Sequence, residues 1–211
     1  MNVIINGLDL SDKGITVTDV YVSEASPKLI RTDIPGRDGL LDQSKAVSGF
    51  INYQNRQMTI VGYAQESYED YLKRYSWLLN EINGQTAEII NTSDADFIWK
   101  GRPTVTYTKV NSIYSEITIN CEVHPYKLKK QDTIVEKTVS EDNTAVICAN
   151  LARPVVPMIE TSKAMQISFE NKIFNVQAGT HILDILFIAG ENTLTVTGNG
   201  NIKITYREGS L

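Results

Sequence analysis

The chain has 211 residues, a formal net charge of -5 at pH 7 and a pI near 5.1. Its 42% hydrophobic and 21% charged residues are ordinary globular usage, which excludes a disordered chain. An acidic chain also lacks the lysine and arginine footprint that holds nucleic acid or an anionic membrane. Apolar runs stay below the roughly 18 residues of a membrane-spanning helix. Residues 1–7 do not resemble a secretion signal, so we expect synthesis in a cytoplasm.

The N-terminal part predicts β-strands interrupted by one helix. Val17, Val20 and Val22 belong to an early strand pattern, and residues 58–63 form a second one. From residue 67 to 83, apolar residues recur at steps of three and four and define a helical face. Ser67 with Asp70 predicts a capping box at its start, and Gly84 predicts its end.

Residues 113–123 alternate between apolar and polar side chains, after a Thr-rich strand pattern that contains Val105 and Tyr107. This alternation predicts an antiparallel strand with one buried face. The inward set runs from Ile113 to Val123 and places Cys121 in the core.

Periodicity lapses over residues 127–132, which predicts a domain boundary and divides the chain into residues 1–130 and 131–211. Beyond it, short strand patterns at 165–169, 172–176, 181–188, 194–196 and 202–206 are separated by turns rich in Gly and Asn. This spacing is typical of a β-sandwich or jelly roll. The predicted class is therefore mainly β, with one helix.

The motifs of common enzymes are missing from the sequence: the phosphate loop, the dinucleotide glycine fingerprint and the strand-elbow serine. His124 and His181 fall in different predicted domains, and Cys121 with His124 has no second Cys or His pair to complete a zinc site. Cys121 and Cys148 are interpreted as buried free thiols. We therefore predict a protein without enzymatic activity, with no catalytic residues, no cofactor and no metal.

Two acidic pairs, Asp94 with Asp96 and Glu141 with Asp142, lie in polar loops and are interpreted as solvated turn residues. A sugar-binding role needs an exposed aromatic platform, yet both tryptophans lie in the N-terminal part, and Trp77 beside the helical face is interpreted as a packing residue. A carbohydrate-binding adhesin whose C-terminal sandwich recognises sugar remains an alternative.

Residues 32–42 contain two turn signals, Pro35-Gly36 and Asp38-Gly39, which would hold Arg37 and Asp38 at a tip. One interpretation is an ordinary hairpin loop with a local salt bridge. The other is a loop that contacts another protein, because functional contacts concentrate on loops presented by rigid scaffolds.

This stretch, Ile-Pro-Gly-Arg-Asp-Gly-Leu-Leu-Asp at 34–42, resembles the distal tail proteins of siphophages and prophages of Gram-positive bacteria. Further features follow in the matching order: the strand at 57–62 running into the helix, Trp-Lys-Gly at 99–101, His-Pro-Tyr at 124–126, Gly-Glu-Asn at 190–192 and the final residues 206–211. The order of these features, over nearly the whole chain, carries the resemblance.

The resemblance implies an N-terminal belt domain that assembles into a six-membered ring around the tail channel, and a C-terminal galectin-like sandwich. It also implies a structural role in the virion at the tail tip, after synthesis in the bacterial host cytoplasm. The implied partners are other copies of the chain, the tail tube protein, the tail-associated hub protein and receptor-binding or baseplate proteins. DNA would pass through the ring without specific binding. The expected contact residues between copies are Pro35, Gly36, Arg37, Asp38 and Gly39. A tail tube or adaptor protein is a further alternative.

Overall fold

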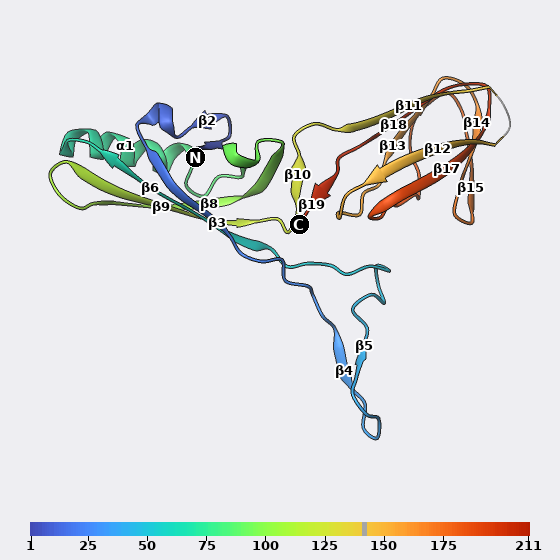
Figure 1. The fold of residues 1–211 in the computed structure, drawn as a ribbon, viewed down its shortest axis with the longest axis horizontal. Helices are drawn as coiled ribbons and strands as arrows, with labels where there is room; N and C mark the ends of the chain where they lie inside the picture. Colours follow the sequence, from blue (N-terminus) through green and yellow to red (C-terminus); the bar gives the residue numbers. More distant parts are fainter. Residues whose placement is uncertain (141–142) are drawn as a thin grey trace. The chain divides into compact units, whose positions relative to one another are not determined.

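The computed structural model describes residues 1–140 and 143–211, and these form two compact units (Figure 1), Met1–Pro125 and Tyr126–Leu211. The protein is mainly β, as predicted, and α1 (Tyr68–Glu81) is the one α-helix of the described residues. None of the described helices is long and apolar enough to cross a membrane.

The N-terminal unit is built on one antiparallel sheet, and α1 lies beside this sheet (Figure 1). Its strand order is β2-β1-β7-β8-β9-β6-β3. The bounds are β1 (Val3–Ile5), β2 (Leu8–Asp9), β3 (Thr16–Val22), β6 (Arg56–Gln65), β7 (Ala87–Asn91), β8 (Phe97–Lys109) and β9 (Tyr114–Val123), with short 3-10 helices η1 (Ser11–Lys13) and η2 (Thr92–Asp94). The first strands of the chain thus lie at both edges of the sheet.

A β-bulge explains the valine spacing in β3. Strict alternation would place Val17 and Val20 on opposite faces. The register with β6 shifts between Val17 and Asp19, so one extra residue is accommodated. Val17 is buried, and Val20 and Val22 also pack against the core.

Helix α1 begins and ends where the sequence predicts. The backbone N–H of Asp70 donates to Ser67 Oγ at 3.2 Å, and Ser67 Oγ donates to Asp70 Oδ2 at 2.7 Å. Gly84 adopts a left-handed φ of 72° just beyond the helix. Leu78 is fully buried, and Trp77 packs against the core as expected.

Strand β9 confirms the buried face that the alternation predicts, except at its first residue. Ile117, Ile119, Cys121 and Val123 are buried in the core. Ile113, however, is 68% exposed, and its prediction as an inward residue was wrong. The strand begins only at Tyr114, because residue 113 belongs to the turn that joins β8 to β9.

The C-terminal unit contains two antiparallel sheets that enclose a second core, with strand orders β11-β18-β13-β16 and β12-β17-β14-β15. The bounds are β11 (Thr133–Val139), β12 (Thr144–Asn150), β13 (Met158–Thr161), β14 (Met165–Phe169), β15 (Lys172–Val176), β16 (Gly179–Ile182), β17 (Gly190–Gly198) and β18 (Gly200–Tyr206). Short strands β10 (Lys127–Lys129) and β19 (Gly209–Ser210) pair with each other. The expected division at residues 130 and 131 lies just after β10.

The predicted strand at 181–188 was wrong in extent. β16 stops at Ile182, and the following residues leave the sheet. Phe187 instead exchanges two backbone hydrogen bonds with Val155, at 2.9 and 3.0 Å, and its side chain is fully buried. A run of apolar residues indicates burial but does not distinguish a strand from a buried connection.

Candidate functional site: an exposed arm and the opposite end of its sheet

The two strands β3 and β6 continue beyond the N-terminal sheet as a long arm (Figure 1). Backbone bonds extend the pairing outward, from Lys28 N to Asn52 O at 2.7 Å and from Gln54 N to Ser26 O at 2.8 Å. The arm ends in a hairpin of β4 (Arg31–Asp33) and β5 (Leu40–Asp42). We call residues 23–55 the arm.

The predicted contact residues, Pro35 to Gly39, all lie at the tip of the arm and are all exposed. Gly36 and Gly39 have φ values of 83° and 73°, as the turn signals predict, because only glycine adopts them without strain. The salt bridge of this hairpin joins Arg31 to Asp42, with Nε and Oδ2 3.9 Å apart. The hairpin interpretation is therefore correct for the backbone.

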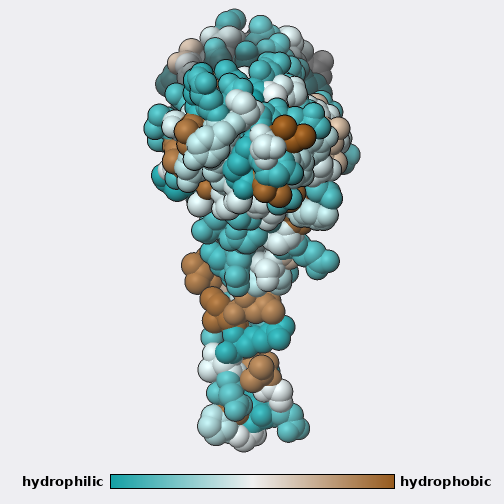
Figure 2. All heavy atoms as spheres, turned by 90° about the vertical axis from the view of Figure 1, so that its left-hand side faces the viewer, coloured by the Kyte–Doolittle hydropathy of each residue, from teal (hydrophilic) through white to brown (hydrophobic). Residues whose placement is uncertain are grey.

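The arm carries large apolar side chains in water. Leu29, Ile30 and Leu40 are about half exposed and Val47 is 94% exposed. Brown side chains follow the arm in the space-filling view (Figure 2). A two-stranded ribbon is only marginally stable alone, and an exposed apolar surface marks an interaction site. The arm has the properties of a segment that another molecule covers.

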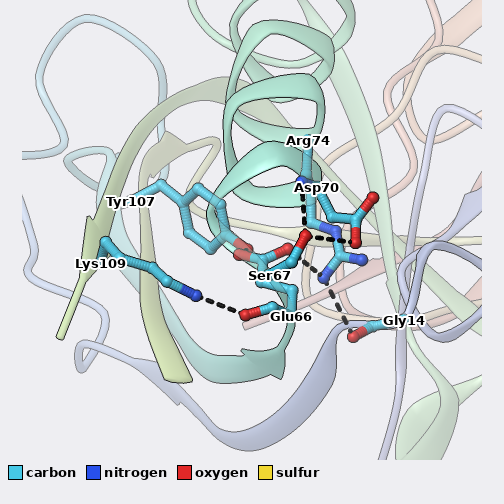
Figure 3. Close-up of polar contacts among 7 residues, drawn as sticks. All are labelled: Gly14, Glu66, Ser67, Asp70, Arg74, Tyr107 and Lys109. Carbon is cyan, nitrogen blue, oxygen red and sulfur yellow. Dashed lines mark hydrogen bonds and ion pairs between the residues drawn. The ribbon is translucent and has the colours of Figure 1, made fainter. Parts of the chain in front are cut away.

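The opposite end of β6 leads into a buried polar cluster below the start of α1 (Figure 3). Glu66, whose side chain is 1% exposed, lies just before the N-cap Ser67 and pairs with Arg74, with Oε2 and Nη1 2.9 Å apart. Tyr107 donates its hydroxyl to Glu66 Oε1, and Lys109 Nζ donates to the Glu66 carbonyl at 2.6 Å. The cluster fixes α1 to the hairpin of β8 and β9.

Burial of Tyr107 and its hydrogen bond to Glu66 raise the pKa of its hydroxyl well above the ordinary value. Tyr107 therefore keeps its proton at neutral pH. Reasoning from the sequence does not identify Glu66 as a site residue. Its residue type before a helix N-cap gives no signal that the side chain turns inward to meet Arg74.

The histidines and cysteines considered for chemistry form no described metal site. His124 and His181 lie in separate units, and His181 Nε2 is 2.7 Å from the Gln177 carbonyl. Cys121 and Cys148 are buried and free, and burial raises the pKa of each thiol to about 11. Within residues 1–140 and 143–211, no group of three or more His, Cys, Asp or Glu could hold a metal ion.

Of the two acidic pairs, only Asp94 with Asp96 lies within the described residues. Asp94 ends the short helix η2, whose N-cap Asn91 accepts a bond from the Ser93 N–H at 3.0 Å. This is the capping chemistry of a turn. Glu141 and Asp142 lie outside the described residues.

The C-terminal unit has a polar groove of about 410 Å³ on the sheet β11-β18-β13. The residues that line it are Glu136, Lys137, Thr138, Glu160, Ser162, Asn201, Ile202 and Lys203. Several of them already contact each other. Lys203 Nζ lies 3.5 Å from Glu136 Oε1, and Thr138 Oγ1 donates to Asn201 Oδ1 at 3.0 Å. This described lining contains no aromatic platform for a sugar ring, so the groove does not favour the adhesin alternative.

Comparison with solved structures gives a match over nearly the whole chain, whereas comparison of sequences gives none. No family model and no curated protein sequence matches the chain. The crystal structure of SPP1 Dit (gp 19.1), described as a paradigm of the hub adsorption apparatus in phages that infect Gram-positive bacteria, superposes with a TM-score of 0.68. The match covers 98% of each chain at 15% sequence identity. The chain has the fold of a phage distal tail protein. The expected likeness is thereby confirmed at the level of the fold.

Proposed function

We propose that this chain is a non-enzymatic structural protein of a phage tail tip, and that copies of it form a six-membered ring. The observation that carries the proposal is the arm, which extends beyond the N-terminal sheet and exposes apolar side chains. The fold match to a phage hub protein over both whole chains supports the same conclusion. In the virion, such a ring would connect the tail tube to the tail-associated hub protein and to receptor-binding or baseplate proteins.

Within this proposal, the N-terminal unit is the ring-forming belt domain and residues 131–211 form an outer galectin-like domain. The arm contacts the neighbouring copy, with Pro35, Gly36, Arg37, Asp38 and Gly39 at its tip. Covering its apolar residues would supply about 25 cal/mol for each Å² removed from water. A repeated contact between unlike surfaces closes into a ring when its rotation closes.

DNA would pass through the ring without specific binding, and the net charge of -5 supports this. The solvent face of β8 and β9 is a suitable wall. Thr104, Thr106 and Thr108 line it on β8, and Glu116 and Glu122 on β9 are exposed on the same face. Arg102, opposite Glu122 on this face, donates to the Gly84 carbonyl, and the neutral hydroxyls and carboxylates of the face would not hold phosphates. A basic lumen in an assembled ring would contradict this part.

The first experiment measures solution mass by light scattering after size exclusion, at several protein concentrations. We expect a species of six protomers. A variant with Leu29→Ser, Ile30→Ser and Leu40→Ser should remain monomeric, because the apolar contact is lost. The double variant Arg37→Ala and Asp38→Ala should also assemble less well if the tip lies in the contact.

Ile173→Ser is the matched control, since Ile173 is 65% exposed on the other unit. It should assemble like the wild type. A wild-type protein that stays monomeric at every concentration, or an arm variant that assembles normally, would contradict the ring contact. If the protein forms a ring and the arm variants form it equally well, the tail-tip role stands but the arm is not the contact between copies.

A further inference from the structure

The end of the N-terminal unit opposite the arm carries an apolar surface of its own. Tyr68 is 63% exposed and Leu72 46% exposed, one turn apart on α1. Val110 and Ile113, 52% and 68% exposed, lie in the turn between β8 and β9. The Ile113 carbonyl accepts a hydrogen bond from the Glu66 N–H at 3.0 Å, which holds this turn beside the start of α1. We call these four residues the end patch.

The end patch is held in place from below. The ring of Tyr71 stacks on those of Tyr68 and Tyr107, with centroids 6.0 and 5.1 Å apart. The buried carboxylate of Glu66 binds Arg74 of the helix and Tyr107 of β8, so both parts of the patch are tied to one charge (Figure 3). A surface that is already ordered loses little conformational entropy when it binds.

The arm and the end patch stand at opposite ends of the same strand. The arm joins β6 at Arg56, whereas Gln65, at its other end, pairs with Tyr114 beside the patch. Ten residues of strand separate these ends by about 30 Å. In Figure 1, the turn of β8 and β9 lies at one end of the sheet, and the arm leaves from the other and points away.

The two surfaces also match in chemistry. Each has apolar side chains bordered by charges of both signs: Arg31 and Asp42 on the arm, and Glu69 and Lys73 beside the end patch. Contact between them would bury apolar surface on both sides without gathering charges of one sign. Complementary surfaces at opposite ends of one unit produce a head-to-tail contact, which repeats from copy to copy.

We propose that the arm of one copy docks on the end patch of the next copy. This inference rests on the proposed ring and names the surface that receives the arm. The occupant is the apolar stretch of the arm around Leu29, Ile30 and Leu40.

Engineered cysteines test the docking directly. The native Cys121 and Cys148 are buried, so new surface thiols react alone. A chain with Leu40→Cys and Leu72→Cys, or with Leu40→Cys and Ile113→Cys, is oxidised in solution. We expect a disulfide-linked ladder of dimers to hexamers on a non-reducing gel. The control pair, Leu40→Cys with Ile173→Cys, should give no ladder.

A second measurement tests the patch by assembly. The variant with Tyr68→Ser, Leu72→Ser and Ile113→Ser should need at least about tenfold more protein to assemble. Its tryptophan fluorescence, which reports only the N-terminal unit that contains Trp77 and Trp99, should show wild-type folding. The single variant Tyr68→Phe, which keeps the aromatic ring, should assemble at a lower protein concentration than the triple variant.

The outcomes separate the two proposals. If arm variants abolish assembly while the patch variant assembles normally and no ladder forms, the arm binds elsewhere: the docking inference is overturned and the ring stands. If the wild type forms no assembly and the cysteine variants form no ladder at the highest concentration reached, the ring fails and the docking fails with it.

Discussion

At the scale of single residues, Glu66 shows how one buried charge organises a surface. Its carboxylate is buried and is stabilised by Arg74 and the Tyr107 hydroxyl, and its backbone carbonyl accepts a hydrogen bond from Lys109. Removing one partner of a buried pair costs more than forming the pair gains, because the remaining charge loses its compensation. The sequence did not predict this cluster, since Tyr107 and Lys109 lie 41 and 43 residues beyond Glu66.

We expect Glu66→Gln to lower the free energy of unfolding of the N-terminal unit by about 2 kcal/mol, because Arg74, whose side chain is 18% exposed, loses its counter-charge. Urea unfolding followed by tryptophan fluorescence measures this change. Glu69→Gln is the control: Glu69 pairs with Lys73 in water, so its loss should change little. Equal midpoints for the two variants would contradict the structural role of Glu66.

At the scale of elements, the sequence predicts what local periodicity encodes and misses what distant pairing decides. The helix from Ser67 and the buried face of β9 follow from side-chain spacing alone. The pairing of β1 with β7 depends on residues far along the chain. The exposure of Ile113 depends on where the turn between β8 and β9 ends, which the alternation does not show. The arm tip was predicted from its glycines, but the arm itself was not, because its strands alternate too briefly to show a period.

One close approach between strands explains a glycine of the Trp-Lys-Gly motif. A Cβ on Gly101 would lie 2.5 Å from the Glu122 carbonyl oxygen and 2.7 Å from Cys121 Sγ. We expect Gly101→Ala to destabilise the N-terminal unit by about 1–3 kcal/mol, because β8 and β9 must separate to admit the methyl group. Thr104→Ala, at an exposed position of the same strand, is the control for thermal unfolding. Similar melting temperatures for both would argue that the sheet yields without cost.

At the scale of the whole molecule, the chain contains two cores that share no buried residue. The second is closed by its last residues: Glu208 accepts bonds from Lys129 Nζ at 2.5 Å and Thr133 Oγ1 at 2.6 Å, and Arg207 pairs with Asp132. Residues at the end of the chain thus hold those at the start of the second unit, which a local pattern cannot reveal.

This clamp predicts a pH dependence confined to the C-terminal unit. Burial alone would raise the pKa of Glu208, but the bonds from Lys129 and Thr133 outweigh it and lower the pKa below 4.5. A lowered folded-state pKa stabilises the fold above pH 4.5, and the contribution is lost as pH falls through the folded value. Glu208→Gln should remove this dependence.

Circular dichroism of both units, compared with tryptophan fluorescence of the first, separates the two transitions, since both tryptophans lie in the N-terminal unit. The Glu208→Gln variant should shift the dichroism transition of the second unit and leave the fluorescence transition unchanged. A shift of both together would mean that the units unfold as one.

The order of strands in the first sheet has a consequence for synthesis. The residues before Ser23 supply β2 and β1 at one edge and β3 at the other, yet β1 pairs with β7 and β3 with β6. On the ribosome, β1 and β2 can pair with each other at once, but β3 must wait for β6, and the second side of β1 stays unpaired until β7 emerges with Asn91. A product that terminates before Asn91 therefore cannot join β1 and β2 to the rest of the sheet, and it is exposed to chaperones and proteases. The order of the strands therefore leaves an incomplete chain with unpaired strands before it can assemble with other copies.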